Sequence, residues 1–423
     1  MKIVSLKSLR NAEVARLRDR DPSPSPAIQK TVSDILARVR TEGHAAVLDY
    51  ARRFDGLKGN LRVTPAELHK TAERCAKPVR TAIRKAIANV RRFHQKQRET
   101  SWQFKGPHGE TLGQIIRPLD RVGIYVPGGA GVYPSTLIMN AVPAQVAGVP
   151  EIAMVSPCAR GLDPAVAFAA VELGITEVYK TGGAQAVAML AYGTAKVKRV
   201  DKITGPGNVY AALAKKDVFG LVDIDMIAGP SEILVMFDET ADPDWVAADL
   251  LSQAEHGSGY EAVIGVTTSL QAARWVAECV RAQAADSLKR EVVEQVLERF
   301  GRLFVVPDWT LGADLANLLA PEHLEIITKS PRALLPSIRN AGAIFLGPYS
   351  SEPVGDYFAG PNHVLPTNGS ARFFSPLGVY DFYKRTSLIE YTTKAMQREG
   401  PAIATLADAE GFFHHAAAVR KRL

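Results

Sequence analysis

Short runs of β-branched and aliphatic residues alternate with alanine-rich stretches in the middle of the chain, and this alternation restricts the fold more than any other feature. Four such runs each end in glycine or proline: RVGIYVP (121–127), EIAMVSP (151–157), EVYKTGG (177–183) and VDKITGPG (200–207). Strands that alternate with helices are typical of a parallel, doubly wound sheet. We therefore predict an inserted α/β domain over residues 121–231.

A second series of short apolar runs follows the first. It comprises EILVMFD (232–238), EAVIGVTT (261–268), RLFVVP (302–307), LEIIT (324–328) and AIFLG (343–347). The two series predict two Rossmann-like parallel-sheet domains, both incomplete. They could be a duplication of one fold, although no residue-level repeat is visible.

The rest of the chain has a different texture. The segment DPSPSP (21–26) separates a short N-terminal piece from the rest of the chain, and amphipathic helical patterns follow it up to about residue 100. Beyond about residue 370 the pattern becomes helical again. We expect four regions: an N-terminal arm (1–25), a split α/β domain with most of the site residues (26–120 plus 232–370), the inserted domain (121–231) and a helical tail (371–423).

Composition narrows the class of protein. The chain has 423 residues, with 51 Lys and Arg against 44 Asp and Glu, so its net charge of +7 is thinly spread. The basic stretch 84–98 has apolar residues at helical spacing, which indicates a solvated helix face and not a nucleic-acid site. Three widely spaced cysteines suit a reducing compartment. No run reaches the ~18 apolar residues of a membrane span, so we expect a cytoplasmic enzyme without membrane or nucleic-acid partners.

Three glycine-rich segments leave predicted strands and enter predicted helices: VPGGAGVYPS (126–135), TGGAQAVAML (181–190) and TGPGNVYAA (204–212). Such turns can present backbone N–H groups to a phosphate. None is the G-x-G-x-x-G fingerprint followed by an acid, and each alone could be a tight strand–helix turn. Three of them at the carboxyl ends of strands favour a nucleotide or anion crevice.

Gln253 and His256 occupy the last turn of a helix that Asp242 and Pro243 begin. At positions i and i+3 their side chains share one face and can reach one ion. A histidine in the last turn is also common simply because it interacts with the helix dipole. The sequence at this point leaves both explanations open.

Two further segments combine histidine with acids. Glu322 and His323 stand side by side just before a predicted strand, where an acid and an imidazole can divide general-base work, or form only a polar pair in a loop. The long Gly/Pro-rich segment 347–367 contains Asp356 and His363. A loop of that length inside a compact enzyme is usually functional, and Asp356 is a plausible metal ligand.

The tail contributes Glu410, His414 and His415, and helical geometry by itself favours Glu410 with His414. Nucleophilic chemistry has little support, because no G-x-S-x-G elbow is present and Ser231 has no histidine near it in sequence. Cys158 has no basic neighbour earlier in its turn that would activate it.

Long blocks of the chain resemble the histidinol dehydrogenase family, in the same order and from about residue 30 to the tail. They are VGIYVPGG, YPSTLIMNAVPAQVAGV, GGAQAVAMLAYGT, DKITGPGN, DMIAGPSEILV, DLLSQAEHG, APEHLEI, AGAIFLG and VGDYFAGPNHVLPT. The resemblance is specific because these blocks occur together.

The resemblance implies one Zn²⁺ per site, and the matching ligands are Gln253, His256, Asp356 and His415. The family spacing places the tail ligand five residues after Glu410, which selects His415 over His414. The paired acid and base of the family match Glu322 and His323.

Further contacts follow from the same resemblance. The implied substrate contacts are Ser231, Gln253, His256, His323, Asp356, His363, Glu410 and His415. The implied NAD contacts are Tyr125, Gln185 and Asn208, one at each glycine-rich turn. The tail of this family packs onto the other subunit of a homodimer, so Glu410 and His415 are expected to complete the partner's site.

The implied reaction is the four-electron oxidation of L-histidinol, through bound L-histidinal, to L-histidine with two NAD⁺, the last step of histidine biosynthesis. In this scheme His323 is the base and Glu322 activates water. One alternative is a zinc and NAD dehydrogenase of the same superfamily that oxidises another primary alcohol. A non-catalytic, zinc-stabilised nucleotide-binding module is a second, but such a module has no need of Glu322 and His323.

Overall fold

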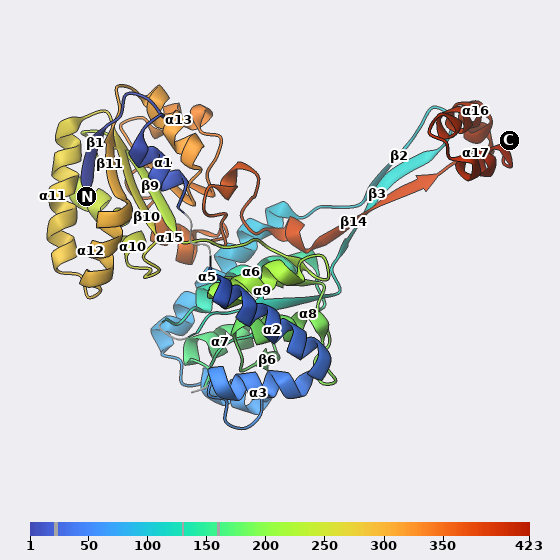
Figure 1. Cartoon of the computed structure of the whole chain (residues 1–423), viewed down its shortest axis with the longest axis horizontal. Helices are drawn as coiled ribbons and strands as arrows, with labels where there is room; N and C mark the ends of the chain where they lie inside the picture. The colour runs from blue at the N-terminus through green and yellow to red at the C-terminus, as the bar shows by residue number, and fades with distance from the viewer. Residues whose placement is uncertain (21–23, 129–130, 159–160) are drawn as a thin grey trace.

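The computed structural model describes residues 1–20, 24–128, 131–158 and 161–423. Two α/β lobes lie next to each other, and a long arm carries a pair of helices away from both (Figure 1). The expected fold class, two parallel-sheet domains with a helical C-terminal region, is confirmed. The expected break at 21–26 lies partly outside the described residues.

The first lobe is built on a six-stranded parallel sheet with the order β1-β11-β10-β9-β12-β13. We call it the six-stranded lobe. Its elements are β1 (Lys2–Ser5), α1 (Ala12–Arg18), β9 (Glu232–Phe237), α10 (Pro243–Ala254), β10 (Ala262–Thr267), α11 (Leu270–Ala285), α12 (Arg290–Phe300), β11 (Gly301–Val305), α13 (Trp309–Leu319), β12 (His323–Ile327), α14 (Pro331–Leu334), β13 (Ala343–Leu346) and α15 (Glu352–Val354).

The second lobe, the five-stranded lobe, has a parallel sheet with the order β6-β5-β4-β7-β8. Its elements are α2 (Pro26–Glu42), α3 (His44–Phe54), α4 (Pro65–Ala72), α5 (Lys77–His94), β4 (Arg121–Tyr125), α6 (Pro134–Ala147), β5 (Glu151–Val155), α7 (Pro164–Glu172), β6 (Glu177–Tyr179), α8 (Gly183–Tyr192), β7 (Lys202–Thr204), α9 (Val209–Val218) and β8 (Asp223–Ile224).

The two sheets share one strand order. In each, the first strand of the series, β9 or β4, lies centrally, the next two strands follow on one side and the last two on the other. The order therefore reverses between β9 and β12 and between β4 and β7. This common topology supports the expectation of two related Rossmann-like folds, and such reversal points are where open α/β sheets bind ligands.

The domain division differs from the one expected. Residues 26–94 were expected to join residues 232–370, but helices α2 to α5 cover the five-stranded lobe instead. Val32 and Val39 of α2, for example, share a buried core with Ala188 and Leu190 of α8. An amphipathic pattern predicts that one face of a helix is buried, but it does not predict which of the two lobes buries it.

The two ends of the chain also differ from expectation. The N-terminal arm is not separate, because β1 pairs with β11 along Lys2–Ser5 and extends the six-stranded sheet. The tail is not only helical. It begins with β14 (Tyr383–Glu390), which pairs antiparallel with β3 (Thr111–Pro118), and β3 in turn pairs with β2 (Trp102–Lys105). This three-stranded arm carries α16 (Thr393–Ala409) and α17 (Phe413–Arg420).

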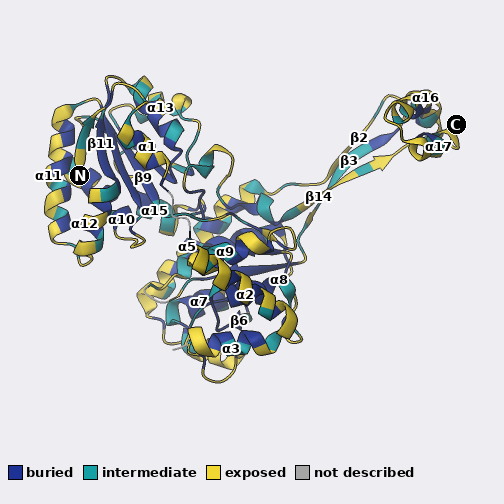
Figure 2. Ribbon diagram, in the orientation of Figure 1, coloured by how far each residue is buried: buried dark blue, intermediate teal, exposed yellow. Residues whose placement is uncertain are grey.

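Burial follows this architecture. The strands of both lobes are buried and their outer helix faces are exposed, whereas the arm is largely exposed on its β14 strand (Figure 2). The described residues include no helix that is long and apolar enough to cross a membrane.

Candidate active site and metal centre

A cavity of about 280 Å³ lies between the two lobes. It is at the carboxyl edge of the five-stranded sheet, where Pro127 follows β4 and Gly205 follows β7. The opposite wall is the amino edge of the six-stranded sheet, where Ser231 precedes β9 and Glu322 precedes β12. The cavity brings together six residues predicted from the sequence: Ser231, His256, Glu322, His323, Asp356 and His363.

His323 is the first residue of β12 and is 2 % exposed. Its Nδ1 lies 3.0 Å from the carbonyl oxygen of Glu232 and donates to it. Its Nε2 lies 3.6 Å from Oδ1 of Asp356 and has no hydrogen-bond partner. The anchored Nδ1 leaves Nε2 as the ring nitrogen that can exchange a proton with a ligand.

Glu322 is buried beside this imidazole, and its Oε2 accepts a hydrogen bond of 3.0 Å from the backbone N–H of Glu232. Burial raises the pKa of Glu322 to about 7, although the neighbouring His323 opposes the shift. A carboxyl group with a pKa near neutrality can both accept and release a proton under physiological conditions.

Asp356 and Glu352 are two further carboxyl groups close to His323. Burial alone disfavours the charged carboxylate of Asp356, but contact with His323 outweighs it and lowers the pKa of Asp356 to about 2. Burial and the nearby Asp356 raise the pKa of Glu352 to about 8. One potential ligand atom from each of the three residues lies within 4.8 Å of the others.

Glu352 was missed in the sequence. It lies in α15, is 3 % exposed, and accepts a hydrogen bond of 3.0 Å from the hydroxyl of Ser252. The available signal was its position four residues before Asp356 in the long Gly/Pro-rich segment, because residues four apart share a helix face.

Gln253 is fully buried in the last turn of α10, yet both its Oε1 and its Nε2 have no hydrogen-bond partner. A buried amide without partners is costly, so such a group usually has a ligand or a functional role. His256 follows on the same helix end and lines the cavity. An orphaned amide oxygen, a histidine and a carboxylate together suit a borderline cation such as Zn²⁺.

His363 closes another side of the cavity. Its Nε2 is buried without a hydrogen-bond partner, and burial lowers the pKa of the ring. A neutral imidazole with an unused nitrogen can bond a polar ligand group.

Comparison with known proteins identifies the family to which the chain belongs. A sequence model of the family described as histidinol dehydrogenase matches residues 18–423. The chain belongs to the histidinol dehydrogenase family. It is thus an oxidoreductase of the dehydrogenase class.

Individual relatives cover nearly the whole chain. The histidinol dehydrogenase of Geobacillus kaustophilus is 51 % identical over 398 residues, which is 93 % of this chain and 94 % of that protein. That of Halalkalibacterium halodurans is 50 % identical over 426 residues, covering 100 % and 99 %. The crystal structure of the enzyme from Elizabethkingia anophelis superimposes with a TM-score of 0.94 at 34 % identity, covering 100 % of this chain and 98 % of that one.

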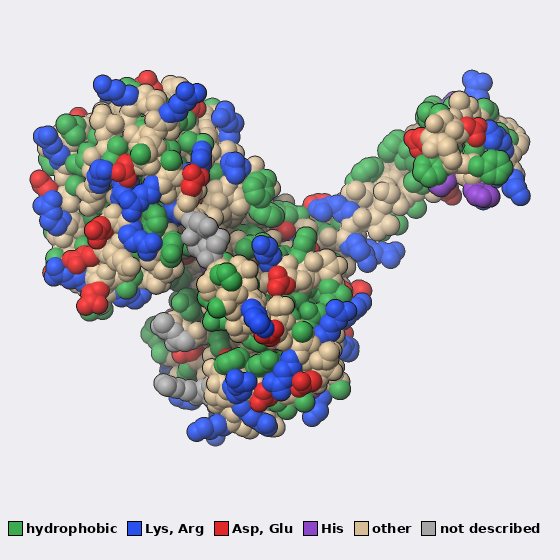
Figure 3. Space-filling model, viewed as in Figure 1, with side chains coloured by type: hydrophobic (Ala, Val, Ile, Leu, Met, Phe, Trp, Pro, Cys, Tyr) green, Lys and Arg blue, Asp and Glu red, His purple; other side chains and the backbone are tan. Residues whose placement is uncertain are grey.

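The site residues predicted in the tail lie away from the cavity of the same chain. Glu410 follows α16 and His415 is in α17, at the far end of the three-stranded arm (Figure 1). Both are exposed, as is His414, and histidine side chains are visible on the tail surface (Figure 3). Because α17 begins only at Phe413, Glu410 and His415 are not on one continuous helix, and the helical argument for His414 does not apply.

The residues predicted to contact NAD lie at the glycine-rich turns, but two of them are buried. The hydroxyl of Tyr125 accepts a hydrogen bond of 2.8 Å from the N–H of Gly183. Gln185 donates one of 3.1 Å to Asp55. Both side chains therefore shape the turn before α8. Asn208 is exposed, and its side chain caps α9 by accepting from the N–H of Ala211.

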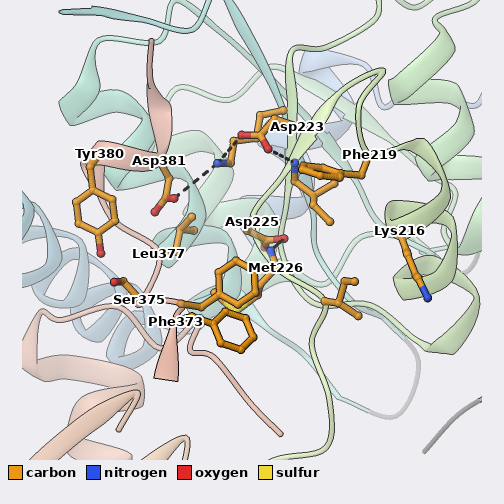
Figure 4. A pocket seen from close by; sticks show the side chains of 14 residues that line it. Lys216, Phe219, Asp223, Asp225, Met226, Phe373, Ser375, Leu377, Tyr380 and Asp381 are labelled. Carbon is orange, nitrogen blue, oxygen red and sulfur yellow. Dashed lines mark hydrogen bonds and ion pairs between the residues drawn. The ribbon is translucent and has the colours of Figure 1, made fainter. Parts of the chain in front are cut away.

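A larger cavity, of about 460 Å³, lies outside the predicted site, between β8 and the segment 373–381 (Figure 4). Lys202 on its floor is 2.9 Å from Oδ2 of Asp223 and 3.7 Å from Oδ1 of Asp381. Phe373 on its rim is 69 % exposed. Lys202, the buried lysine of this cavity, is thus already paired with two acids, and apolar side chains such as Phe373 are exposed beside it.

Proposed function

We propose that this chain is an NAD-dependent histidinol dehydrogenase, which oxidises L-histidinol through bound L-histidinal to L-histidine in the last step of histidine biosynthesis. The observation that carries the proposal is the buried Glu322–His323 pair in a cavity that also contains Asp356 and His256. Family membership supports the substrate.

We propose that Zn²⁺ is bound by Gln253, His256, Asp356 and His415 of the partner subunit. The orphaned amide of Gln253 supports this ligand set, and so does the carboxylate of Asp356 beside His323 in the same cavity. When bound, zinc orients substrate nitrogen atoms and so directs the hydroxymethyl carbon.

Nicotinamide cofactor suits the crevice at the reversal point between β4 and β7, where the turns that begin at Val126 and Gly205 meet the cavity. When bound, NAD⁺ accepts one hydride in each of the two oxidations, so each histidinol consumes two NAD⁺. The exposure of Asn208 at this edge supports the proposal that it contacts the cofactor.

Glu322 and His323 share the proton transfers that the two oxidations require. Nε2 of His323 accepts the hydroxyl proton as the alcohol becomes an aldehyde. Glu322 then removes a proton from the water that adds to the aldehyde, and His323 serves again as base for the hydrated form. A site closed between two lobes and a second subunit keeps the reactive aldehyde from escaping.

The decisive experiment measures NADH formation from L-histidinol and NAD⁺ by the zinc-loaded protein, with a parallel sample treated with a chelator. Two NADH for each histidine formed, lost on chelation and restored by zinc, is the expected result. A folded, zinc-loaded protein that forms no NADH would overturn the proposal. A single NADH with release of aldehyde would overturn its four-electron course.

A further inference from the structure

Behind the Glu322–His323 pair lies a second buried pair, Arg20 and Glu232. We propose that Glu232, held by Arg20, is a positioning residue that keeps Glu322 and His323 in their reactive arrangement. This inference rests on the proposed function. Neither Arg20 nor Glu232 lines the active-site cavity, so neither is in contact with substrate or cofactor.

Glu232 and Glu322 bond to each other reciprocally. The N–H of Glu322 donates to Oε2 of Glu232 over 3.2 Å, and the N–H of Glu232 donates to Oε2 of Glu322 over 3.0 Å. The carbonyl of Glu232 also accepts the bond from Nδ1 of His323. One residue therefore fixes the main chain and carboxylate of the acid, and the ring orientation of the base.

The carboxylate of Glu232 is held in place by the N-terminal segment. Arg20 donates to Oε1 of Glu232 in an ion pair whose two side chains are each 4 % exposed. The backbone N–H of Asn368 donates to the same oxygen over 3.1 Å. Arg20 is in turn anchored on the carbonyls of Leu17 and Tyr260, at 2.9 and 3.0 Å.

A buried ion pair of this kind is a poor source of stability. Removing two charges from water costs about as much as their attraction returns, and apolar pairs of similar volume are often equally stable. The charge of Glu232 does have an effect on chemistry. Burial has the largest effect on the pKa of Glu322, followed by His323 at the start of β12 and then by the like charges of Glu232 on β9 and of Asp356.

The test uses two variants and a matched control. Glu232→Gln keeps the shape and removes the charge, and the double variant R20M/E232M replaces the pair with apolar side chains. Glu13→Gln is the control, because Glu13 makes the same kind of contact between the N-terminal segment and the sheet, through Arg302, away from the site. Thermal unfolding, kcat, KM and the pH profile of kcat/KM are measured for each zinc-loaded protein.

We expect both Glu232 variants to lose about 10- to 100-fold in kcat with little change in KM, because the bound substrate meets a misaligned acid and base. Glu232→Gln also removes a like charge, which lowers the pKa of Glu322 and moves the acid limb of the profile to lower pH. The double variant should unfold near the wild-type temperature, and Glu13→Gln should keep wild-type kcat.

Full kcat in a folded R20M/E232M protein would overturn the positioning role, as would an unmoved acid limb in Glu232→Gln. A loss of kcat in Glu13→Gln equal to that in the Glu232 variants would also overturn it, because any weakening of the N-terminal segment would then suffice. Failure of the proposed function is distinct, since the wild-type protein itself would then form no NADH from histidinol.

Discussion

Glu322 and His323 are neighbours in the chain, yet different causes shift their pKa values. Burial raises the pKa of Glu322 to about 7. Burial by itself lowers the pKa of His323, but the carboxylates of Glu322 and Asp356 outweigh it and raise that pKa to about 10. At this pKa the ring carries a proton at neutral pH. A cation bound at Asp356 would lower the pKa and leave Nε2 free to act as the base of the proposed reaction.

A substitution at Glu322 tests how the pair divides its work. Glu322→Gln should lower the overall rate by about 10²–10⁴-fold and should slow oxidation of added L-histidinal more than oxidation of L-histidinol. The reason is that only the aldehyde step requires activated water. Separate NADH assays with the two substrates make the comparison. Equal loss with both would show that Glu322 has no special role in the aldehyde step.

We expect replacement of Gln253 to weaken metal binding and to stabilise the metal-free protein. Gln253→Leu removes two buried amide atoms that have no partner, so the metal-free protein should be more stable by about 1–3 kcal/mol in urea unfolding with chelator present. The same change should weaken zinc binding, measured by competition with a metal indicator.

The control for Gln253 is Gln185, which is equally buried but is hydrogen-bonded to Asp55. Gln185→Leu removes a hydrogen-bond donor from Asp55 and should therefore destabilise the metal-free protein. A loss of stability in Gln253→Leu as well would mean that its amide is satisfied within the folded chain.

At the scale of elements, two short pieces of structure place the site. Helix α10 starts at the capping residue Asp242 and ends where Gln253 faces inward, so its length sets the position of the residues on its last turn. The N-terminal segment adds β1 to the sheet and brings α1 over it. The first piece places Gln253, and the second brings Arg20 to Glu232 behind the site.

The contact between α1 and the sheet has a defined pH dependence. Hydrogen bonds from Lys2 and Arg302 lower the pKa of Glu13 from 4.5 to about 2. The folded-state pKa lies below the unfolded value, so the stabilisation is complete above pH 4.5 and disappears as pH falls toward 2. Glu13→Gln should therefore cost about 1 kcal/mol in urea unfolding at neutral pH, and progressively less below pH 4.5.

Asp34→Asn is the comparison for Glu13, because the Lys30–Asp34 pair joins two exposed side chains on α2. Its unfolding midpoint should match that of the wild type at every pH, since exposed pairs contribute little. A constant difference between Glu13→Gln and wild type down to pH 3 would contradict the link to the carboxylate.

At the scale of the whole molecule, the residues of the proposed zinc site lie in two separate parts of the chain. The cavity contains Asp356 and His256, whereas Glu410 and His415 stand on the tail beyond the three-stranded arm (Figure 1). The tail also exposes Leu406 and Phe413, and Phe373 is exposed beside the larger cavity of the five-stranded lobe. Apolar surface on both parts supports the proposal that two copies associate and exchange tails.

Mixed dimers test that exchange. His323→Ala and His415→Ala are each expected to be inactive alone. Co-expressed in equal amounts, they should regain about a quarter of the wild-type activity, because half of the dimers are mixed and each mixed dimer has one intact site. No recovery in dimers shown to be mixed would contradict a shared site.

The positions of most elements could be predicted from the sequence, because they depend on local patterns. The run 232–238 is apolar and ends in an acid, and it forms β9 over Glu232–Phe237. The strands of the arm escaped prediction, since β14 exposes most of its side chains and lacks an apolar alternation. The site residues Asp356 and His323 were found from the polar residues near them in sequence and from the family resemblance, whereas Glu352 offered only its spacing of four residues from Asp356.

The sequence by itself determined the alternation of strands and helices, the glycine-rich turns and the chemistry of the paired Glu322 and His323. Only the tertiary structure decided that α2 packs against α8 and α9 of the five-stranded lobe, that the amide of Gln253 has no hydrogen-bond partner, and that Arg20 reaches Glu232 across 212 positions of the chain. The reason is physical. Periodicity and turn chemistry act between near neighbours, whereas the partner of a buried charge depends on how distant segments pack.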